Sequence, residues 1–436
     1  MRVLFATGSP AHYMAPPVLS EEQICCGPDW ADVRRTDGRW LSVKTPVGEY
    51  DLARKVACLP QDQQPEVVVC LVDASWRHVP RNLSALRCPK ILLVADTHHL
   101  RSPLVGMVQY ATMERYDRVV LLYDYHHSVV FRSAGIKNLG WFPGLTFPHS
   151  DEVVLAARHA RAKRNLGLAF IGQEGRFHPR RTKLLTALRE AGLPVKTKVV
   201  SQLDALRSYG RSSVGFNASL NGDLNLRVFE IIAAGAALLT DRLSEEAGMN
   251  RLFADGRELA TYGSADELLG LARDLLANPA KAEAIGEAGA RWFDQNFAAA
   301  KRREDFKALV MDGRSPPWVD RAATPAAAPL FSGNPRSLAA ATLVYEKVQE
   351  WHRNQEEVLF AIGAGVSGEV AALFSTLPRV RCVPATGILK AHLHVATWAE
   401  IRGTTINTPW LWCWDGVAQD PAALRALMKG AGFEGE

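Results

Sequence analysis

The sequence predicts an α/β protein built on parallel sheets, and three observations lead to this prediction. Short runs of consecutive apolar residues, such as Glu66–Val72 and Ile91–Ala95, are typical of strands buried on both faces. Intervals long enough for a helix separate these runs along the chain. The segment 315–336 is rich in Pro and Ala, which is typical of a linker, and it separates a C-terminal segment from the rest of the chain.

Composition limits the classes of function. The 436 residues have room for two or three domains, and 47% hydrophobic and 22% charged residues are ordinary for a soluble globular protein. The net charge of +5 is too diffuse to indicate a nucleic-acid partner. Seven cysteines without metal-ligand spacing favour a reducing compartment. The apolar runs are too short for a signal peptide or a spanning helix, so we expect a cytoplasmic protein with at most peripheral membrane contact.

The first strand is predicted at Arg2–Ala6, with a turn after it. Gly8 in this turn lets the backbone approach a ligand, although an ordinary tight turn explains it equally well. His12 is a candidate for an acceptor contact. We interpret Glu21–Asp62 as loops with an edge hairpin.

Three ionisable residues, Asp96, His98 and His99, follow the predicted strand Ile91–Ala95, and the next strand is Val119–Tyr123. Histidine titrates near neutrality, so a residue here can accept a proton from a substrate hydroxyl or stabilise developing charge. The alternative is that one histidine caps a helix and the other is solvated. No further ligand follows nearby, so we predict no metal site.

In the second half, the strand Leu168–Ile171 leads into a loop that begins at Gly172, and a helix is predicted at Thr182–Ala191. Arg176, Arg180 and Arg181 lie between them. Basic residues at the start of a helix can neutralise a diphosphate, whereas the alternative places them on a solvated helix face.

The segment 213–242 is predicted to form a strand (Val214–Ala218), a loop (Ser219–Asn225), a helix (Leu226–Ala234) and a second strand (Ala236–Thr240). The loop follows the carboxyl end of a parallel strand, where ligands bind in such sheets. Asp223 or Asn225 can cap the helix, whose first amides attract an anion.

Arg227 and Glu230 are three residues apart and therefore share one face of this helix. The guanidinium can donate to phosphate oxygens, and the carboxylate can accept from a sugar diol. Together they can hold a nucleotide by its diphosphate and its ribose. The alternative is a capped helix with a solvent-facing ion pair.

The run NGDLNLRVFEIIAAGAALLTDR, followed by LFADGRELATYGSADELLGLARDLLANP, resembles the donor domain of the CgeB-like (spore-maturation type) glycosyltransferases of the GT-B superfamily. Glu230, Ala233 and Gly235 match the motif E-x-x-A-x-G, whose Glu contacts the donor ribose. Gly222 stands where many relatives carry a second Glu, and Asp223 is the nearest substitute. The resemblance extends over about Ile91–Ala308.

The resemblance implies two Rossmann-like domains that face a cleft: an acceptor domain at 1–145 and a donor domain at 146–314. A linker at 315–335 and a small α/β appendage at 336–436 complete the predicted α/β architecture. A His or Asp after the strand at Ile91–Ala95 faces the reacting centre in related enzymes, which makes Asp96, His98 and His99 the catalytic candidates. The predicted donor-binding residues are Gly172, Arg176, Arg180, Asn221, Gly222, Asp223, Asn225, Leu226, Arg227 and Glu230.

The implied function is transfer of a sugar from a nucleotide-diphosphate donor to an unknown acceptor, which can be a glycan, a protein or a small molecule. We expect retention of configuration, no cofactor and no metal, because arginines and helix amides can stabilise the departing diphosphate. An epimerase or hydrolase on the same fold remains an alternative, as does a non-catalytic nucleotide-sugar-binding component of a surface-glycan assembly system. The oligomeric state stays open, self-association included.

In the C-terminal part, Gly363–Gly368 matches G-x-G-x-x-G between a predicted strand and a helix. No acidic residue follows at the distance usual for ribose binding, so close helix–strand packing competes with a nucleotide or S-adenosylmethionine site. The latter would make the chain bifunctional. The tryptophans form either a sugar-stacking surface or an interface, or belong to the core: Trp398, Trp410, Trp412 and Trp414.

Overall fold

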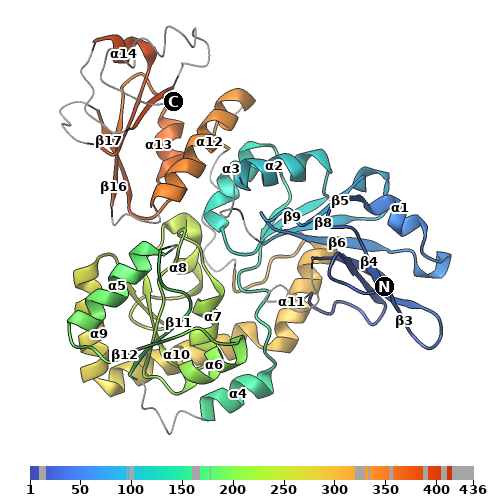
Figure 1. Ribbon diagram of the computed structural model, residues 1–436, viewed down its shortest axis with the longest axis horizontal. Helices are drawn as coiled ribbons and strands as arrows, with labels where there is room; N and C mark the ends of the chain where they lie inside the picture. Colours follow the sequence, from blue (N-terminus) through green and yellow to red (C-terminus); the bar gives the residue numbers. More distant parts are fainter. Residues whose placement is uncertain are drawn as a thin grey trace.

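A computed structural model describes residues 1–8, 16–95, 97, 103–159, 167–176, 178–319, 329–331, 334–352, 357–385, 391–403 and 410–414. These residues form three α/β bodies, each built on its own mainly parallel sheet (Figure 1). The first body holds the N-terminus, the second contains the segment 213–242, and the third is the C-terminal appendage.

The first body contains an eight-stranded sheet in the order β10-β9-β8-β6-β1-β2-β4-β3, in which only the β3–β4 pair is antiparallel. Its central strands are apolar throughout and completely buried, as the consecutive apolar runs predict. The strands are β1 (Val3–Ala6), β2 (Gln23–Gly27), β3 (Val33–Arg34), β4 (Trp40–Lys44), β6 (Val67–Val72), β8 (Lys90–Val94), β9 (Arg118–Leu121) and β10 (Leu139–Trp141). A separate parallel pair is formed by β5 (Gly48–Asp51) and β7 (His78–Arg81), and the helices are α1 (Leu52–Ala57), α2 (Pro103–Met113) and α3 (Ser128–Ser133).

The prediction of loops for Glu21–Asp62 was wrong in part. The expected edge hairpin exists as β3–β4, but β2 and β4 also join the main sheet as parallel strands. The sequence signal is weak because β2 (QICCG) has only three apolar residues and β4 (WLSVK) lies near the edge, half-buried. Pairing with a neighbouring strand, of β2 with β1 and of β4 with β2, decides their conformation.

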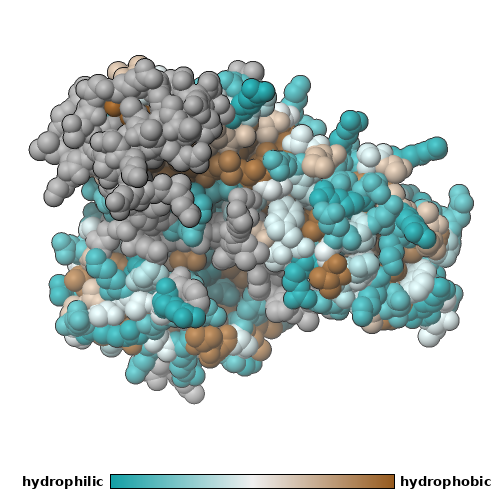
Figure 2. Space-filling view, turned by 45° about the horizontal axis from the view of Figure 1, so that its top comes forward, coloured by the Kyte–Doolittle hydropathy of each residue, from teal (hydrophilic) through white to brown (hydrophobic). Residues whose placement is uncertain are grey.

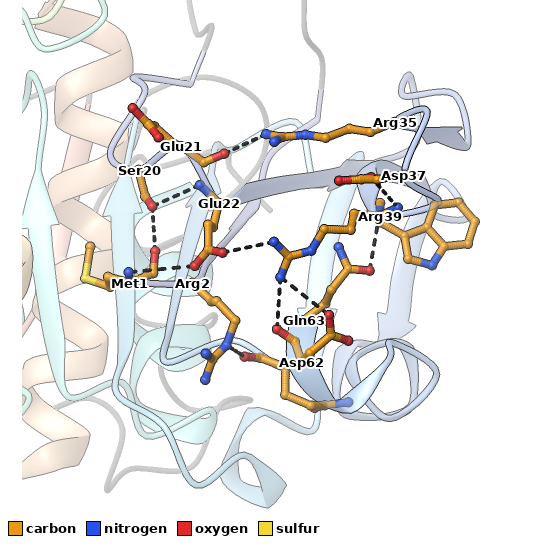
Figure 3. Close-up of polar contacts among 12 residues, drawn as sticks. Met1, Arg2, Ser20, Glu21, Glu22, Arg35, Asp37, Arg39, Asp62 and Gln63 are labelled. Carbon is orange, nitrogen blue, oxygen red and sulfur yellow. Dashed lines mark hydrogen bonds and ion pairs between the residues drawn. The ribbon is translucent and has the colours of Figure 1, made fainter.

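A network of polar contacts covers the amino ends of β1, β2 and β4 (Figure 3). Arg39 lies at its centre: its Nη1 is 3.1 Å from Glu22 Oε1, and its Nη2 is 3.5 Å from Asp62 Oδ2. These side chains are 35 to 68% exposed, so each pair contributes at most about 1 kcal/mol. The network lies at the sheet edge opposite the carboxyl ends, where ligands of parallel sheets bind.

The second body contains a five-stranded, entirely parallel sheet in the order β12-β11-β13-β14-β15. Its strands are β11 (Leu168–Ile171), β12 (Val195–Lys198), β13 (Val214–Phe216), β14 (Ala237–Asp241) and β15 (Ala260–Tyr262). The helices are α4 (Asp151–His159), α5 (Pro179–Glu190), α6 (Gln202–Gly210), α7 (Leu226–Ala233), α8 (Met249–Leu252), α9 (Ala265–Ala277), α10 (Pro279–Phe297) and α11 (Ala299–Asp312). The predicted strand–loop–helix–strand unit is confirmed as β13, α7 and β14.

A cluster of aromatic rings joins the first two bodies. Phe229 of α7 stacks on Phe297 of α10 with ring centroids 4.8 Å apart, and Trp318 meets the rings of Phe297 and Phe142 edge-on. Helix α11 returns to the first body, where Arg118 donates a hydrogen bond to the Leu309 carbonyl. Taking large aromatic rings out of a buried cluster costs free energy, so this cluster holds α7 against the rings that join the two bodies.

The appendage contains a four-stranded parallel sheet in the order β17-β16-β18-β19. Its strands are β16 (Val358–Ile362), β17 (Val380–Pro384), β18 (Leu393–Ala396) and β19 (Trp410–Cys413), and its helices are α12 (Pro335–His352), α13 (Gly368–Phe374) and α14 (Trp398–Gly403). Helix α12 contacts α2 and α3 of the first body, and the Thr376 carbonyl accepts a hydrogen bond from the Ser244 hydroxyl of the second body, so the appendage touches both other bodies (Figure 1).

The described surface in Figure 2 is mostly hydrophilic, with hydrophobic residues in small separate groups. Among the residues that the structure describes, none of the helices has the length and apolar character needed to cross a membrane.

Candidate functional site

The loop before α7 presents a turn and a cap at the carboxyl edge of the second sheet. Asn225 is the N-cap of α7, and its Oδ1 accepts from the Arg227 amide at 3.1 Å, as one of the two predicted alternatives requires. The other candidate, Asp223, instead accepts from the Asn221 amide at 3.2 Å. Gly222 between them has φ +79°, a conformation that favours glycine. The loop therefore holds its shape by local hydrogen bonds.

Arg227 is held on the edge of the sheet. Its Nε donates to the Ile171 carbonyl at 2.8 Å and its Nη1 donates to Asn217 Oδ1 at 2.9 Å, so it bridges the ends of β11 and β13. The guanidinium also lies 4.7 Å from the centroid of the Phe170 ring. A Cβ on Gly172 would lie 2.5 Å from Nη2, which explains why only glycine fits there. The alternative of a solvent-facing arginine does not describe this side chain.

Glu230 lies one helical turn further along α7 and is 8% exposed. Burial raises the pKa of its carboxyl to about 7, against the opposing effect of the Arg227 charge. No hydrogen bond reaches its side chain from any described residue, and no ion pair joins it to Arg227. A buried carboxylate without hydrogen bonds is costly and is a marker of functional sites.

Two arginines from the start of α5 reach the same edge. Arg180 Nη1 is 3.1 Å from Asp241 Oδ2 at the end of β14, and Arg181 donates to the carbonyls of Gln173 and Ala218 at 3.1 and 3.2 Å. Both residues are buried, at 6% and 8% exposure, so the alternative of a solvated helix face is wrong for them. Burial and the nearby Arg227 lower the pKa of Arg181 to about 10. Arg176, in contrast, is exposed on the loop.

The predicted catalytic residues Asp96, His98 and His99 lie outside the described residues, as does His12. Gly8 is described, and its carbonyl accepts from the Asp29 amide at 3.2 Å. The role of all five residues in the reaction remains a prediction.

A buried polar cluster at the carboxyl ends of β8 and β9 was not found from the sequence. Thr97 donates from its amide and its hydroxyl to Asp124 Oδ2 at 3.2 and 3.0 Å, and its hydroxyl is 2.6 Å from His127 Nδ1. Asp124, His126 and His127 place one potential ligand atom each within 4.8 Å of the others. His127 Nε2 is also 3.0 Å from Gln349 Oε1, so both nitrogens of that ring take part in a hydrogen-bond network.

With this geometry in view, residues 157–308 match the family model described as "Glycosyl transferase-like". This part of the chain is therefore similar to that family. The matched residues cover most of the second body and include every described residue of the predicted donor site. A comparison with curated proteins found no match.

Several solved structures are similar to the chain, and one of them has a TM-score that supports a shared fold. Sucrose-phosphate synthase from Thermosynechococcus elongatus is 11% identical with a TM-score of 0.50, and the similarity covers 71% of this chain and 98% of that one. A structure of Anabaena Alr3699/HepE in complex with UDP and glucose is 12% identical (TM-score 0.48, 72% and 100% covered). A trehalose 6-phosphate synthase from Burkholderia multivorans is 13% identical (TM-score 0.45, 72% and 96% covered). The likeness to the synthase identifies the fold as GT-B, with two Rossmann-like domains.

The appendage covers part of the loop before α7, which the sequence gave no means to foresee. A Cβ on Gly222 would lie 2.5 Å from Pro378 Cδ, and Asn221 is completely buried. Arg379 Nη1 is 3.6 Å from Asp241 Oδ2. Asp241 could have been found from the sequence, because it is the polar residue that ends the apolar run ALLTD. Arg379 could not, since it is about 140 residues away in the chain.

The glycine-rich loop of the appendage is occupied by its own side chain. Glu400 Oε1 accepts from the Gly365 amide at 2.9 Å, and a Cβ on Gly363 would overlap the same carboxylate. A phosphate at this loop would meet a carboxylate, so the geometry favours close packing over a nucleotide site. Trp412 and Trp414 pack against the core, as the alternative to a sugar-stacking surface predicts. The side chains of Trp398 and Trp410 lie outside the described set.

Proposed function

We propose that the chain is a glycosyltransferase that takes a sugar from a nucleotide-diphosphate donor bound in its second domain. One observation carries the proposal: Glu230 is buried without a hydrogen bond at the carboxyl edge of a parallel sheet, one turn from Arg227. The match of this domain to a glycosyl transferase-like family supports it.

In this proposal each buried group meets one part of the donor. The Glu230 carboxylate accepts two hydrogen bonds from the ribose diol, which supplies the partners that the protein does not. Arg227, Arg180 and Arg181 place guanidinium groups near the diphosphate. They attract it in the ground state and stabilise the charge that develops as it departs.

Further features of the reaction belong to the same proposal. Because guanidinium groups can stabilise the leaving diphosphate, we propose that transfer needs neither a metal nor a cofactor. The acceptor approaches from the first domain, where Asp96, His98 and His99 are the candidates for proton transfer. We also propose a CgeB-like enzyme that retains the configuration at the transferred carbon and acts in the cytoplasm as a peripheral or free protein.

The donor is identified by thermal stabilisation with UDP, GDP, ADP and CDP and their sugars. A ligand at a hundred times its dissociation constant stabilises the protein by about 2.7 kcal/mol, which such an assay detects readily. Glu230→Ala should abolish the stabilisation, whereas Glu304→Gln, an exposed change on α11, should preserve it. If no nucleotide stabilises the wild-type chain, the proposal is wrong.

A second assay separates transfer from the alternatives. Nucleotide release from the identified donor is measured with and without a panel of glycan, protein and small-molecule acceptors. Release that depends on an acceptor supports transfer, and release at the same rate without one indicates a hydrolase. Conversion to a different nucleotide sugar indicates an epimerase, and binding without any turnover indicates the non-catalytic component.

A further inference from the structure

A cavity of about 450 Å³ lies where the chain crosses between the first and the second body. Residues 145–148, in the connection from β10 to α4, form one wall, and residues 302–303 at the start of α11 form another. Figure 1 shows α11 between these two bodies. The third wall is formed by residues 16–18, between β1 and β2. A volume in the range of about 300 to 1,000 Å³ is typical of sites for small molecules.

Two walls of this cavity are mostly apolar and are fixed by hydrogen bonds. Gln23 holds the segment 16–18, because its Nε2 donates to the Pro17 carbonyl at 3.2 Å and its Oε1 accepts from the Leu19 amide at 2.8 Å. On the opposite wall, the Phe147 amide donates to the Gly144 carbonyl at 2.9 Å. These bonds form within the protein itself, so the cavity is preformed.

Arg302 brings a positive charge to these apolar walls. Its guanidinium carbon lies 5.3 Å from the centroid of the Phe147 ring and 5.0 Å from that of the Phe297 ring. Ring faces attract a cation, but the N–H groups of a guanidinium need oxygen acceptors, which these rings do not supply. Nη1 of Arg302 is buried and has no hydrogen-bond partner among the described residues. The protein thus leaves a buried donor unpaired beside the cavity.

The acidic residues near Arg302 are engaged elsewhere. The charge of Asp151 acts on Arg302, but Asp151 Oδ1 accepts from the Ala299 amide at 2.8 Å, at the start of α11. Asp305, three residues beyond Arg302, pairs with Lys301 at 3.4 Å. Within the part of the chain that the structure describes, no ion pair joins Arg302 to a carboxylate. A buried cation without a counter-ion is costly, and an anion in the cavity would reduce that cost.

The local electrostatics agree with this reading. Burial lowers the pKa of the Arg302 guanidinium to about 10, against the effect of Asp151, and the Arg303 charge adds to the decrease. The group is still charged at neutral pH. The pKa of His149 is also lowered, first by burial and further by the Arg302 charge, although a hydrogen bond with the Gln202 backbone opposes the decrease. A bound anion would favour the charged form of Arg302.

Arg303 adds a second cation to the lining. Its side chain is exposed, and it forms no ion pair with any residue that the structure describes. The described lining contains no acidic side chain. Two neighbouring arginines therefore face a cavity whose other walls are mostly apolar, which suits a ligand with both an anionic and an apolar part.

We propose that this cavity binds a small molecule that carries a carboxylate or phosphate group on an apolar body. The anionic group accepts hydrogen bonds from Arg302 and Arg303, and the apolar body packs against Pro16, Val18 and Phe147. The cavity shares no lining residue with the proposed donor site, so this second site goes beyond the proposed function and does not depend on it.

Calorimetry on the full-length protein tests the proposal with two anionic probes, hexanoate and phenyl phosphate. We expect at least one of them to bind about tenfold or more tightly than its neutral counterpart, hexanol or phenol, because only the anion forms charge-assisted hydrogen bonds. Acetate and inorganic phosphate, which lack the apolar body, should bind more weakly than the corresponding probe. Equal binding of the charged and the neutral probes, or no binding of either anionic probe, would overturn the proposal.

Two variants locate the binding site. Arg302→Gln should weaken binding of the tighter anionic probe by about tenfold or more. Lys307→Gln removes a positive charge from an exposed position on the same helix and should bind the probe like wild type. Val18 lines the cavity and is 65% exposed, so Val18→Trp fills the space without changing the core and should abolish binding even if Arg302→Gln does not fold. Unchanged affinity in either folded variant would contradict the assignment.

The two proposals fail in different ways. Phenyl phosphate can also occupy a nucleotide site, so its binding is repeated with Arg227→Gln, a change in the proposed donor site. Binding that is lost in Arg227→Gln and kept in Arg302→Gln would show that the probe occupies the donor site, and the proposal for the cavity would be wrong. If wild type binds an anionic probe through Arg302 and binds no nucleoside diphosphate, the cavity is confirmed and only the proposed function is wrong.

Discussion

Replacing Glu230 with glutamine should stabilise the protein in neutral and alkaline buffer. An ordinary glutamate has a pKa of 4.5, and burial raises that of Glu230 to about 7. A carboxyl whose pKa is higher in the folded state binds its proton more tightly there than in the unfolded chain. Between pH 4.5 and 7 the folded state therefore loses stability as pH rises, and above pH 7 the loss is complete.

The size of the loss follows from the two pKa values. At 1.36 kcal/mol per pH unit, a rise from 4.5 to about 7 amounts to about 3 kcal/mol at pH 8 and about 1 kcal/mol at pH 5. Glutamine has the same shape without the charge, so Glu230→Gln should recover most of this free energy. The variant should also bind nucleotide sugar poorly, because a stabilised functional site commonly loses function.

Urea denaturation at pH 5 and pH 8 measures the effect, with Glu304→Gln as the exposed control. The expected result is a gain in the free energy of unfolding that is larger at pH 8 than at pH 5 by about 2 kcal/mol. An equal effect at the two pH values, or no gain at pH 8, would refute the reasoning that the carboxylate is buried at a cost. Such a result would remove the main observation behind the proposed donor site.

Three other predictions concern the same site. The affinity for a nucleotide sugar should be about tenfold weaker at pH 6 than at pH 8, because the ionised fraction of Glu230 is about 0.9 at pH 8 and about 0.1 at pH 6. The diphosphate of the ligand does not titrate in this range. Calorimetry at both pH values checks the prediction, and the pH dependence should disappear in Glu230→Gln. Gly172→Ala should displace the Arg227 guanidinium, since the added Cβ lies 2.5 Å from Nη2. Nucleotide binding should therefore be weaker by about tenfold or more. The control Gly270→Ala, which has open space around its Cβ, should bind nucleotide like wild type in the same assay. Chelation with EDTA should leave nucleotide release unchanged if arginines alone stabilise the leaving diphosphate, and a loss of activity that Mg²⁺ restores would contradict metal-independent transfer.

The elements with strong local signals could be predicted well. Helix α7 begins at Leu226 as predicted, and it ends within one residue of its prediction because Gly235 follows it. Asn225 was one of two predicted caps because only short polar side chains can accept from the first amides of a helix. In contrast, β2 was missed because its conformation depends on a partner strand and not on its own composition.

The candidate site divides in the same way. Arg227 and Glu230 were predicted from their spacing on one helix, which the local sequence determines. That Arg227 turns inward to Ile171 and Asn217 depends on where β11 and β13 end in space. The same residues at the same spacing are compatible with an exposed ion pair, so the sequence could not distinguish a solvent-facing Arg227 from one that turns inward.

By itself, the sequence determined the parallel α/β class, the helix that carries Arg227 and Glu230, and the resemblance to sugar transferases, because periodicity, caps and short motifs are local properties. Only the tertiary structure decided the burial of Glu230 and the contact of Arg379 with Asp241. Burial and ion pairing depend on which distant segments pack together, and Asp241 and Arg379 are about 140 residues apart in the sequence. Burial of Glu230 raises the pKa of its carboxyl, a consequence that composition alone does not reveal.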